Sequence, residues 1–339
     1  MDGKGLSGSE RFQDPADLGG NIQEVGRMMF YASKTGNTIN GHGYKYSPEL
    51  LGRVCLNPYY KCNLVCDQKY LLDSGAFQDV RKENRLTFDK ALGRQLEFEK
   101  KVGMPAYEIV SYDWLVDEQM ENGIQIKKRV SSMDSEQYVD ETIKAAKYLS
   151  DRRTSLSPRK LVLSNQGTTT NEYLGCVEQI LDFAHTDDVI GFGGFCIVSQ
   201  QRKYENQFYQ VIDKAFPMIA EKGVKRAHIF GVGLFRVLIN AENLARKYGI
   251  ELSYDTSAYT FSSVNGRVLN PVELEMSYVF TKKQKMSGYN PDVLSMFNTQ
   301  SVHNFWKRWG EMELLDSFEV DTQFHKVADI PTKTLDEWL

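Results

Sequence analysis

The chain has 339 residues and a formal net charge of −4 at pH 7, from 41 basic and 45 acidic side chains. This balance excludes a broadly basic nucleic-acid coat, although a local basic groove could form at Lys222, Lys225 and Arg226 or along 282–285. Hydrophobic residues make up 41% of the chain, enough for a substantial core. The apolar runs, of about four to eight residues, are too short to span a bilayer. With no signal-peptide pattern at its start, we expect a soluble cytoplasmic protein.

Short β-rich runs alternate with helical patterns after a polar, Gly-rich segment, 1–25, that we expect to be loosely ordered. The expected strands are 28–33, 70–77, 107–113, 160–167, 189–195, 227–233 and 251–258. The expected helices are 87–102, 136–150, 171–185, 204–222 and 235–248. In the last helix, Leu238, Leu244 and Ala245 predict a buried stripe beside exposed Arg246 and Lys247.

The alternation continues at intervals of about 25 to 45 residues without a linker, which favours one (β/α)8 barrel of the TIM type over two domains. A doubly wound sheet is the alternative. The eighth strand is expected within 26–60 or after 270. The barrel domain would then span 26–339. Its last part, about 290–339, holds three of the four tryptophans and is expected to pack as helices outside the barrel.

In a TIM barrel the active site lies at the carboxyl ends of the strands. Those ends carry Asp73-Ser74-Gly75, Asp113, Gln166-Gly167, Gly193-Gly194, Gly231-Val232-Gly233 and Asp255-Thr256-Ser257. Taken singly, such residues more often cap helices or form turns, so the prediction rests on their convergence. Such a set could displace a group at a sugar anomeric carbon, one carboxylate attacking while another group manages the leaving group's proton. An aromatic side chain such as Phe77 could stack on a planar base.

The five cysteines, at 55, 62, 66, 176 and 196, form no regular framework, and without a secretory segment disulfides are not expected. Cys55, Cys62 and Cys66 could bind a metal with a fourth ligand such as His42. Their spacing matches none of the common zinc or iron–sulfur patterns. We therefore expect no cofactor, with zinc as the disfavoured alternative.

The run DSGAFQ at 73–78 resembles the DSG-[GA]-[FY]-Q signature of the tRNA-guanine transglycosylase superfamily. Three further matches follow in the family's order: QG at 166–167, GG at 193–194 and GVG at 231–233. The stretch DTSAY followed by NGR, within 255–267, is similar to the DSASY…NGR stretch of the archaeal-type members. The resemblance spans roughly residues 70–267, which is about the whole expected barrel.

The resemblance implies that Asp255 is the nucleophile and Asp73 the general acid/base. It implies that Asp113 binds the N1/N2 edge of a guanine-like base, although the flanks of this aspartate are atypical. Gln166 would hold the O6 side with the glycine pair. The full set implied for base binding is Phe77, Asp113, Gln166, Gly193, Gly194 and Gly233, and that for the polynucleotide backbone is Arg267 and Ser74.

The chain departs from the tRNA-modifying enzymes in one respect. They carry a C-terminal CxCxxC…H zinc site, whereas no cysteine follows Cys196 here. At 339 residues we also expect no room for an appended RNA-binding module. Both features fit the bacterial and phage branch that inserts 7-deazaguanine bases such as preQ0 into DNA, which in a phage would act in the host cytoplasm. The expected partners are DNA, or alternatively tRNA, and a free 7-deazaguanine; a homodimer or an accessory protein is a further option, and no membrane is expected.

Three other interpretations compete with this one. A non-catalytic paralogue would serve as a nucleic-acid-binding subunit, but it is disfavoured because Asp73, Asp255 and Phe77 are all present. A nucleotide-binding enzyme would use GVGLF or GFGGF as its phosphate loop, yet neither has the G-x-G-x-x-G pattern after a first strand. A radical enzyme would use KCNLVC at 61–66, whose two cysteines do not match a three-thiolate cluster motif.

Overall fold

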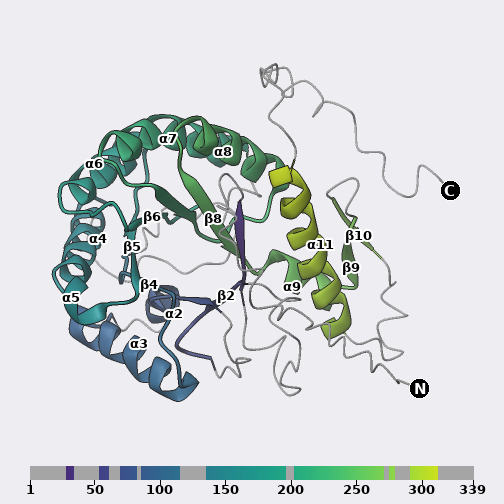
Figure 1. Ribbon diagram of the computed structural model, residues 1–339, viewed down its shortest axis with the longest axis horizontal. Coiled ribbons are helices and arrows are strands. Elements are labelled where there is room, and N and C mark those ends of the chain that lie inside the picture. The colour runs from purple at the N-terminus through teal and green to yellow at the C-terminus, as the bar shows by residue number, and fades with distance from the viewer. Residues whose placement is uncertain are drawn as a thin grey trace, which may run out of the picture.

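The computed structural model describes residues 28–33, 53–60, 69–81, 85–114, 135–195, 202–270, 275–278 and 291–311. Eight parallel strands form a closed barrel in chain order, with the first strand paired to the last (Figure 1). The strands are β1 (Met29–Ser33), β2 (Arg53–Leu56), β3 (Tyr70–Leu72), β4 (Glu108–Val110), β5 (Lys160–Asn165), β6 (Val189–Phe192), β7 (Arg226–Ile229) and β8 (Glu251–Thr256). The predicted TIM-type barrel is confirmed, and the doubly wound alternative is wrong because the sheet has no open edge.

Strand β2 is the eighth strand that the sequence left undefined, and it lies within 26–60. It joins β1 to β3, with Cys55 paired to Ser33 on one side and Leu71 on the other. One buried cluster consists of side chains from six strands: Tyr31, Cys55, Leu71, Val110, Val162 and Val189. These branched and aromatic residues fill a layer of the barrel interior, as expected for strands buried on both faces.

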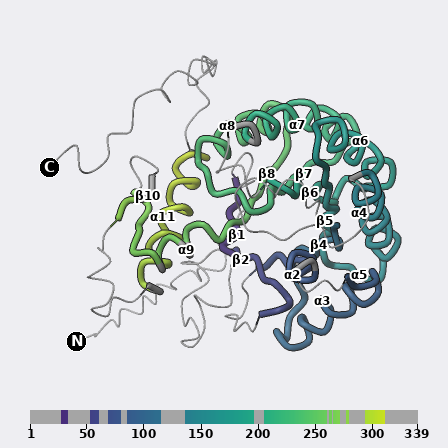
Figure 2. The backbone as a smooth tube through the Cα atoms, turned by 180° about the vertical axis from the view of Figure 1, so that it is seen from behind, coloured from purple at the N-terminus to yellow at the C-terminus, as the bar shows by residue number. Residues whose placement is uncertain are grey.

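Helices follow the strands and surround the barrel as an arc, which both views show (Figures 1 and 2). They are α3 (Phe88–Val102), α4 (Ser135–Ser150), α5 (Arg153–Leu156), α6 (Thr170–Leu181), α7 (Arg202–Glu221) and α8 (Phe235–Lys247). Local signals fix their ends. Thr169 and Glu172 form a reciprocal capping box at the start of α6, and Gly103 ends α3 in the left-handed conformation. In the described part of the chain, every helix is too short or too polar to cross a membrane.

Most expected strands extend past the observed ones, and two of them, 70–77 and 251–258, include residues that belong to a helix. The run 70–77 ends as a strand at Leu72, because Gly75 adopts a φ of 77° and helix α2 (Ala76–Arg81) begins directly after it. Likewise β8 ends at Thr256, and α9 (Ala258–Val264) follows. The expected exposure of Arg246 is also wrong: its side chain is 10% exposed and pairs with buried Glu242 at 2.9 Å.

Helix α11 (Pro291–Glu311) packs beside β1 and α9 at the open side of the helical arc (Figure 1). Trp306 is 1% exposed, and its Nε1 donates to the Tyr254 hydroxyl at 2.8 Å. Asn298 accepts from the Leu269 amide at 2.7 Å, which ties α11 to a two-stranded ribbon of β9 (Arg267–Asn270) and β10 (Glu275–Tyr278). The segment 1–25, which we expect to be loosely ordered, and the stretch 312–339 lie outside the described residues.

The amino end of the barrel is closed by buried charges. Arg226 and Glu108 form an ion pair at 2.7 Å, with side chains 6% and 0% exposed. Beside them Arg53 donates to the Tyr31 hydroxyl at 3.2 Å. Burial, and next the charge of Glu108, hold the pKa of Tyr31 well above its ordinary value. The cluster at 222–226 is therefore no basic groove at the mouth, because Arg226 is committed to this buried pair at the opposite end.

Candidate active site

Asp255 is held by hydrogen bonds to both of its carboxylate oxygens. Its Oδ2 accepts from the Ser33 hydroxyl at 2.5 Å, and its Oδ1 accepts from the Gly231 amide at 3.1 Å. The ring of His228 places Nε2 3.3 Å from the same Oδ1. These groups come from β1, β7 and the loop after β7, which closure of the barrel brings around the end of β8. A carboxylate surrounded by donors is fixed in orientation.

Asp73 lies at the end of β3, in a different environment. Its Oδ2 accepts one hydrogen bond, from Asn57 Nδ2 at 2.6 Å. Burial, followed by the charges of Asp113 and Asp255, raises its pKa to about 6, against the smaller opposing effects of Asn57 and the Gly75 amide. A carboxyl group with a pKa near 6 can both give and take a proton near neutral pH. Because the charges of Asp113 and Asp255 both raise the pKa of Asp73, the three carboxyl groups lie in one site.

Asp113 and Gln166 form the third part of the site. Gln166 Nε2 donates to Asp113 Oδ2 at 2.5 Å, and Ser74 Oγ donates to Asp113 Oδ1 at 3.3 Å. Burial raises the pKa of Asp113 above its ordinary value. An amide and a carboxylate side by side offer both donors and acceptors, which is the combination that recognises the polar edge of a heterocyclic base.

Gly193 leaves the room that Gln166 occupies. A Cβ at this position would lie 2.1 Å from Gln166 Nε2, closer than two such atoms can approach. In Gly193→Ala we therefore expect Gln166 to be displaced and its bond to Asp113 broken. Loss of a hydrogen bond to a charged group predicts about a tenfold weaker affinity for a purine or 7-deazapurine base. Calorimetric titration of the free base into the protein measures this.

Gly175→Ala is the matched control for this substitution, because its added Cβ meets nothing within 4 Å in helix α6. Gly175→Ala should bind the base as the wild type does. Unchanged base affinity in Gly193→Ala would contradict a role for the Asp113–Gln166 pair in recognition.

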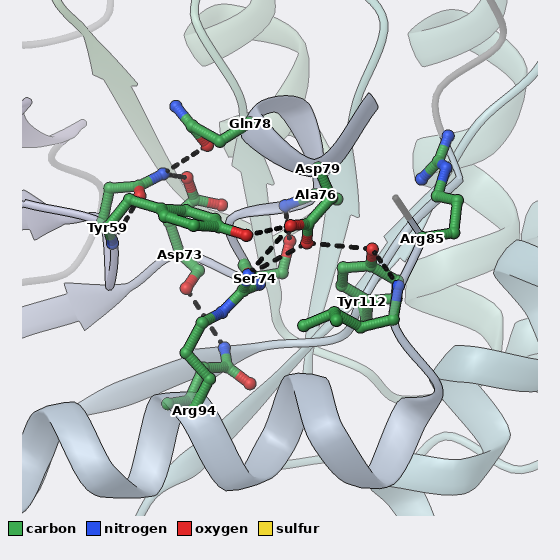
Figure 3. Close-up of polar contacts among 12 residues, drawn as sticks. Tyr59, Asp73, Ser74, Ala76, Gln78, Asp79, Arg85, Arg94 and Tyr112 are labelled. Atoms are coloured by element: carbon green, nitrogen blue, oxygen red, sulfur yellow. Dashed lines mark hydrogen bonds and ion pairs between the residues drawn. The ribbon is translucent and has the colours of Figure 1, made fainter. Parts of the chain in front are cut away.

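The loop that carries Asp73 is fixed by Asp79 of helix α2, as Figure 3 shows. Asp79 accepts from the hydroxyls of Tyr59 and Tyr112 and forms a 3.0 Å ion pair with Arg94. Arg94 also donates to the backbone carbonyl of Ser74. Because Asp79 is 2% exposed and paired on all sides, it holds the loop in place and is not itself a candidate for the chemistry.

Gly75 completes this loop. Its φ of 77° is favourable only for glycine, and a Cβ would lie 2.8 Å from Arg94 Nη2. The glycine therefore lets Arg94 cross under the loop and reach Ser74. The predicted DSG run thus has a structural meaning for each residue: the acid faces the site, and the serine and glycine shape its support.

The structure places the other predicted residues as follows. Phe77 lies half-buried in the first turn of α2, and Gly194 follows β6 with a φ of 79°. Gly233 approaches helix α9, where a Cβ would meet that of Ala258 at 2.7 Å, so its glycine serves packing. Ser74 is 1% exposed and its Oγ donates to Asp113, so its predicted contact with a polynucleotide backbone stays a prediction.

Arg267 is separated from the acids by its place in the fold. It begins β9, outside the barrel, and its guanidinium lies 4.2 Å from the centre of the Tyr278 ring. Tyr278 is 64% exposed. The predicted contact of Arg267 with a nucleic-acid backbone would therefore take place on the β9–β10 ribbon, beside the barrel mouth rather than in it.

Sequence reasoning missed three residues of the site: Ser33, Asn57 and His228. Ser33 ends β1, so the same strand-end rule that found Asp73 could have found it. Asn57 follows β2, the one barrel strand that was not defined. His228 lies inside β7 and faces the barrel interior, against the rings of Phe230 and Tyr31. Only the alternation of inward and outward side chains along the strand could have indicated it.

Of the five cysteines the structure describes Cys55 and Cys176, both buried and free, whereas Cys62, Cys66, Cys196 and His42 lie outside the described residues. Cys55 is 8% exposed beside the acids, and burial, followed by the charges of Asp255 and Asp73, raises its pKa well above the ordinary value. Its thiol therefore stays protonated and poorly reactive. Within the described ranges no group of three or more His, Cys, Asp and Glu side chains could hold a metal ion.

No model of a known protein family matches the chain, and no curated protein is significantly similar to it.

Proposed function

We propose that the protein is a base-exchange transglycosylase, which replaces guanine in DNA by a 7-deazaguanine through a covalent glycosyl intermediate on Asp255. The observation that carries the proposal is the unlike setting of two acids at one barrel mouth. Asp255 is surrounded by hydrogen-bond donors, whereas burial and neighbouring charges raise the pKa of Asp73 to about 6. Two carboxyl groups in unlike environments at one site, one of them with a raised pKa, are typical of glycosyl transfer.

Each acid then has one role. Asp255, as the anion, attacks the anomeric carbon C1′ of the target nucleoside. Asp73, in its protonated form, supplies the proton with which the base leaves, and later takes a proton from the incoming base. Because the target must leave its stack to reach the barrel mouth, the enzyme bears an unstacking cost of a few kcal/mol, as base-flipping enzymes do.

Recognition of the base is assigned to the Asp113–Gln166 pair. Gln166 is 1% exposed and already bonded to Asp113, so its orientation is set before a base arrives. The absence of a side chain at Gly193 keeps it in that orientation. A pre-oriented carboxylate–amide pair suits the N1/N2 and O6 atoms of a guanine-like edge, and Phe77 would cover the face of its ring.

DNA is the polymer that we propose, because the sequence after Cys196 has no cysteine with which to build the zinc site of the tRNA-modifying relatives. The resemblance of residues 70–267 to the archaeal-type motifs supports the chemistry, and this difference supports the choice of substrate. tRNA is the alternative that the assay below separates from it.

The test is incorporation of labelled guanine or preQ0 by the purified full-length protein, with double-stranded DNA and bulk tRNA as separate acceptors. We expect label in DNA, and none with Asp255→Ala. Label in tRNA alone would replace the polymer and retain the chemistry. Label in neither would overturn the proposed catalysis and favour a nucleic-acid-binding subunit of another enzyme.

A further inference from the structure

The imidazole ring of His228 is buried and in direct contact with the Asp255 carboxylate. Its side chain is fully buried inside β7. Nε2 lies 3.3 Å from Asp255 Oδ1, and Nδ1 lies 2.9 Å from Ser253 Oγ. The ring centre of Phe230 is 4.5 Å away, which fixes the plane of the imidazole.

Hydrogen-bond accounting decides which nitrogen carries the proton. An ionised carboxylate only accepts, so Nε2 must carry hydrogen to make a favourable contact with Asp255. Ser253 then satisfies Nδ1 in either state: its hydroxyl can donate to a bare Nδ1, or accept from a protonated one while donating to the Ala227 carbonyl at 3.2 Å. The serine therefore permits the state with Nε2–H directed at Asp255, and the carboxylate selects it.

The two oxygens of Asp255 are thereby made unequal. Oδ1 faces two nitrogen donors, the Gly231 amide and His228 Nε2. Oδ2 is bonded to the Ser33 hydroxyl. An oxygen committed to two N–H groups is a poor nucleophile but a good place for negative charge to collect. The unequal donors thus separate the oxygen that attacks from the oxygen that carries charge.

We propose that His228 is a positioning residue: with the Gly231 amide it holds Oδ1 and receives the charge that returns to Asp255 when the covalent intermediate breaks, while Oδ2 makes the bond to the sugar. This inference rests on the proposed function. In the first step Oδ2 bonds to C1′, the C1′–N bond breaks, and its electron pair leaves with the base, which takes the proton of Asp73.

In the second step the incoming base transfers a proton to Asp73 and bonds to C1′. The electron pair of the Oδ2–C1′ bond returns to Asp255, which becomes an anion again. The donors on Oδ1 stabilise this anion and not the neutral ester. They therefore favour breakdown of the intermediate over its accumulation.

The test is His228→Phe, which keeps the buried ring and removes the donor. We expect exchange to slow by about 10- to 100-fold, with a larger share of the protein trapped as the covalent adduct after a denaturing quench. His228→Gln, whose Nε2 can reach the same oxygen, should restore both values toward the wild type. A merely structural role would lower adduct and turnover together and would not be rescued by glutamine.

Two outcomes would overturn the inference without touching the proposed function. One is wild-type adduct levels and turnover in a folded His228→Phe protein. The other is a nitrogen NMR spectrum of labelled histidine in which Nε2 of His228 carries no proton. Failure of the proposed function has a different signature, because the wild type itself would then form no adduct.

Discussion

Replacing Asp255 by alanine is expected to abolish the covalent adduct and to lower base exchange by at least about 10⁴-fold, since loss of a nucleophile removes the pathway itself. Asp255 is the carboxylate whose Oδ1 and Oδ2 accept from Gly231 and Ser33. A water molecule in the space that the carboxylate leaves cannot form a covalent bond between the protein and the sugar. Intact-protein mass spectrometry, after incubation with a DNA oligonucleotide and a denaturing quench, measures the adduct.

Asp255→Asn is a second variant with the same expected loss and a different structural cost. An amide at this position can keep its oxygen toward Gly231 and His228 and turn its NH2 group toward the Ser33 hydroxyl, which can accept as well as donate. Alanine leaves these buried donors without an acceptor, at a cost of about 1–3 kcal/mol, so Asp255→Asn should unfold at higher urea concentration than Asp255→Ala.

The matched control is Asp187→Ala, the same chemical change at an exposed aspartate in the loop before β6, at the amino end of the barrel. Exchange and adduct formation should be unaffected there. An adduct of normal yield in Asp255→Ala would mean that another group is attacked, and the assignment of the nucleophile would be wrong.

The sequence predicts the barrel well because parallel strands buried on both faces stand out as continuous apolar runs. β2 does not stand out: it is the four residues Arg53–Leu56, begins with an arginine, and is recognised as a strand only when Tyr31 and Leu71 flank it. Strand ends fail for a related reason. Ala76 and Phe77 continue the apolar pattern of β3, yet they start a helix after the turn at Gly75.

The candidate site divides in the same way. The rule that strand ends meet at one mouth correctly gathers Asp73, Asp113 and Gln166, because it needs only the order of the strands. It cannot supply the contact of Ser33 with Asp255, which are 222 positions apart and meet because β1 pairs with β8. That contact is a property of barrel closure, and no local pattern encodes it.

The residues that hold the site's loops in place are the hardest to predict from the sequence. Asp79 follows the signature run by one residue and looks like an ordinary acid in the first turn of a short helix. Its meaning comes from Arg94 on α3 and Tyr112 after β4, which converge on it in three dimensions (Figure 3). Ser74 stands inside the signature run, and its side chain is buried and donates to Asp113.

Asp73→Asn is expected to slow exchange by about 10²- to 10⁴-fold, as for loss of a general acid/base, while making the protein more stable at neutral pH. The pKa of Asp73 is raised from 3.8 to about 6, so the folded protein binds this proton more tightly than the unfolded chain does. Stability from the protonated form is complete below pH 4 and is lost as the pH rises through 6.

An asparagine removes that penalty, because it is neutral at every pH and its oxygen can still accept from Asn57. A shift of about two units corresponds to roughly 3 kcal/mol, and since the side chain is partly exposed we expect about 1–2 kcal/mol at pH 8. Urea unfolding of both proteins at pH 8, 6 and 4 measures this difference, which should shrink toward zero at the lowest value. If the variant is less stable than the wild type at all three pH values, the Asp73 carboxylate contributes to stability. The acid with a raised pKa that proton transfer requires would then be Asp113, the other carboxyl group whose pKa burial raises.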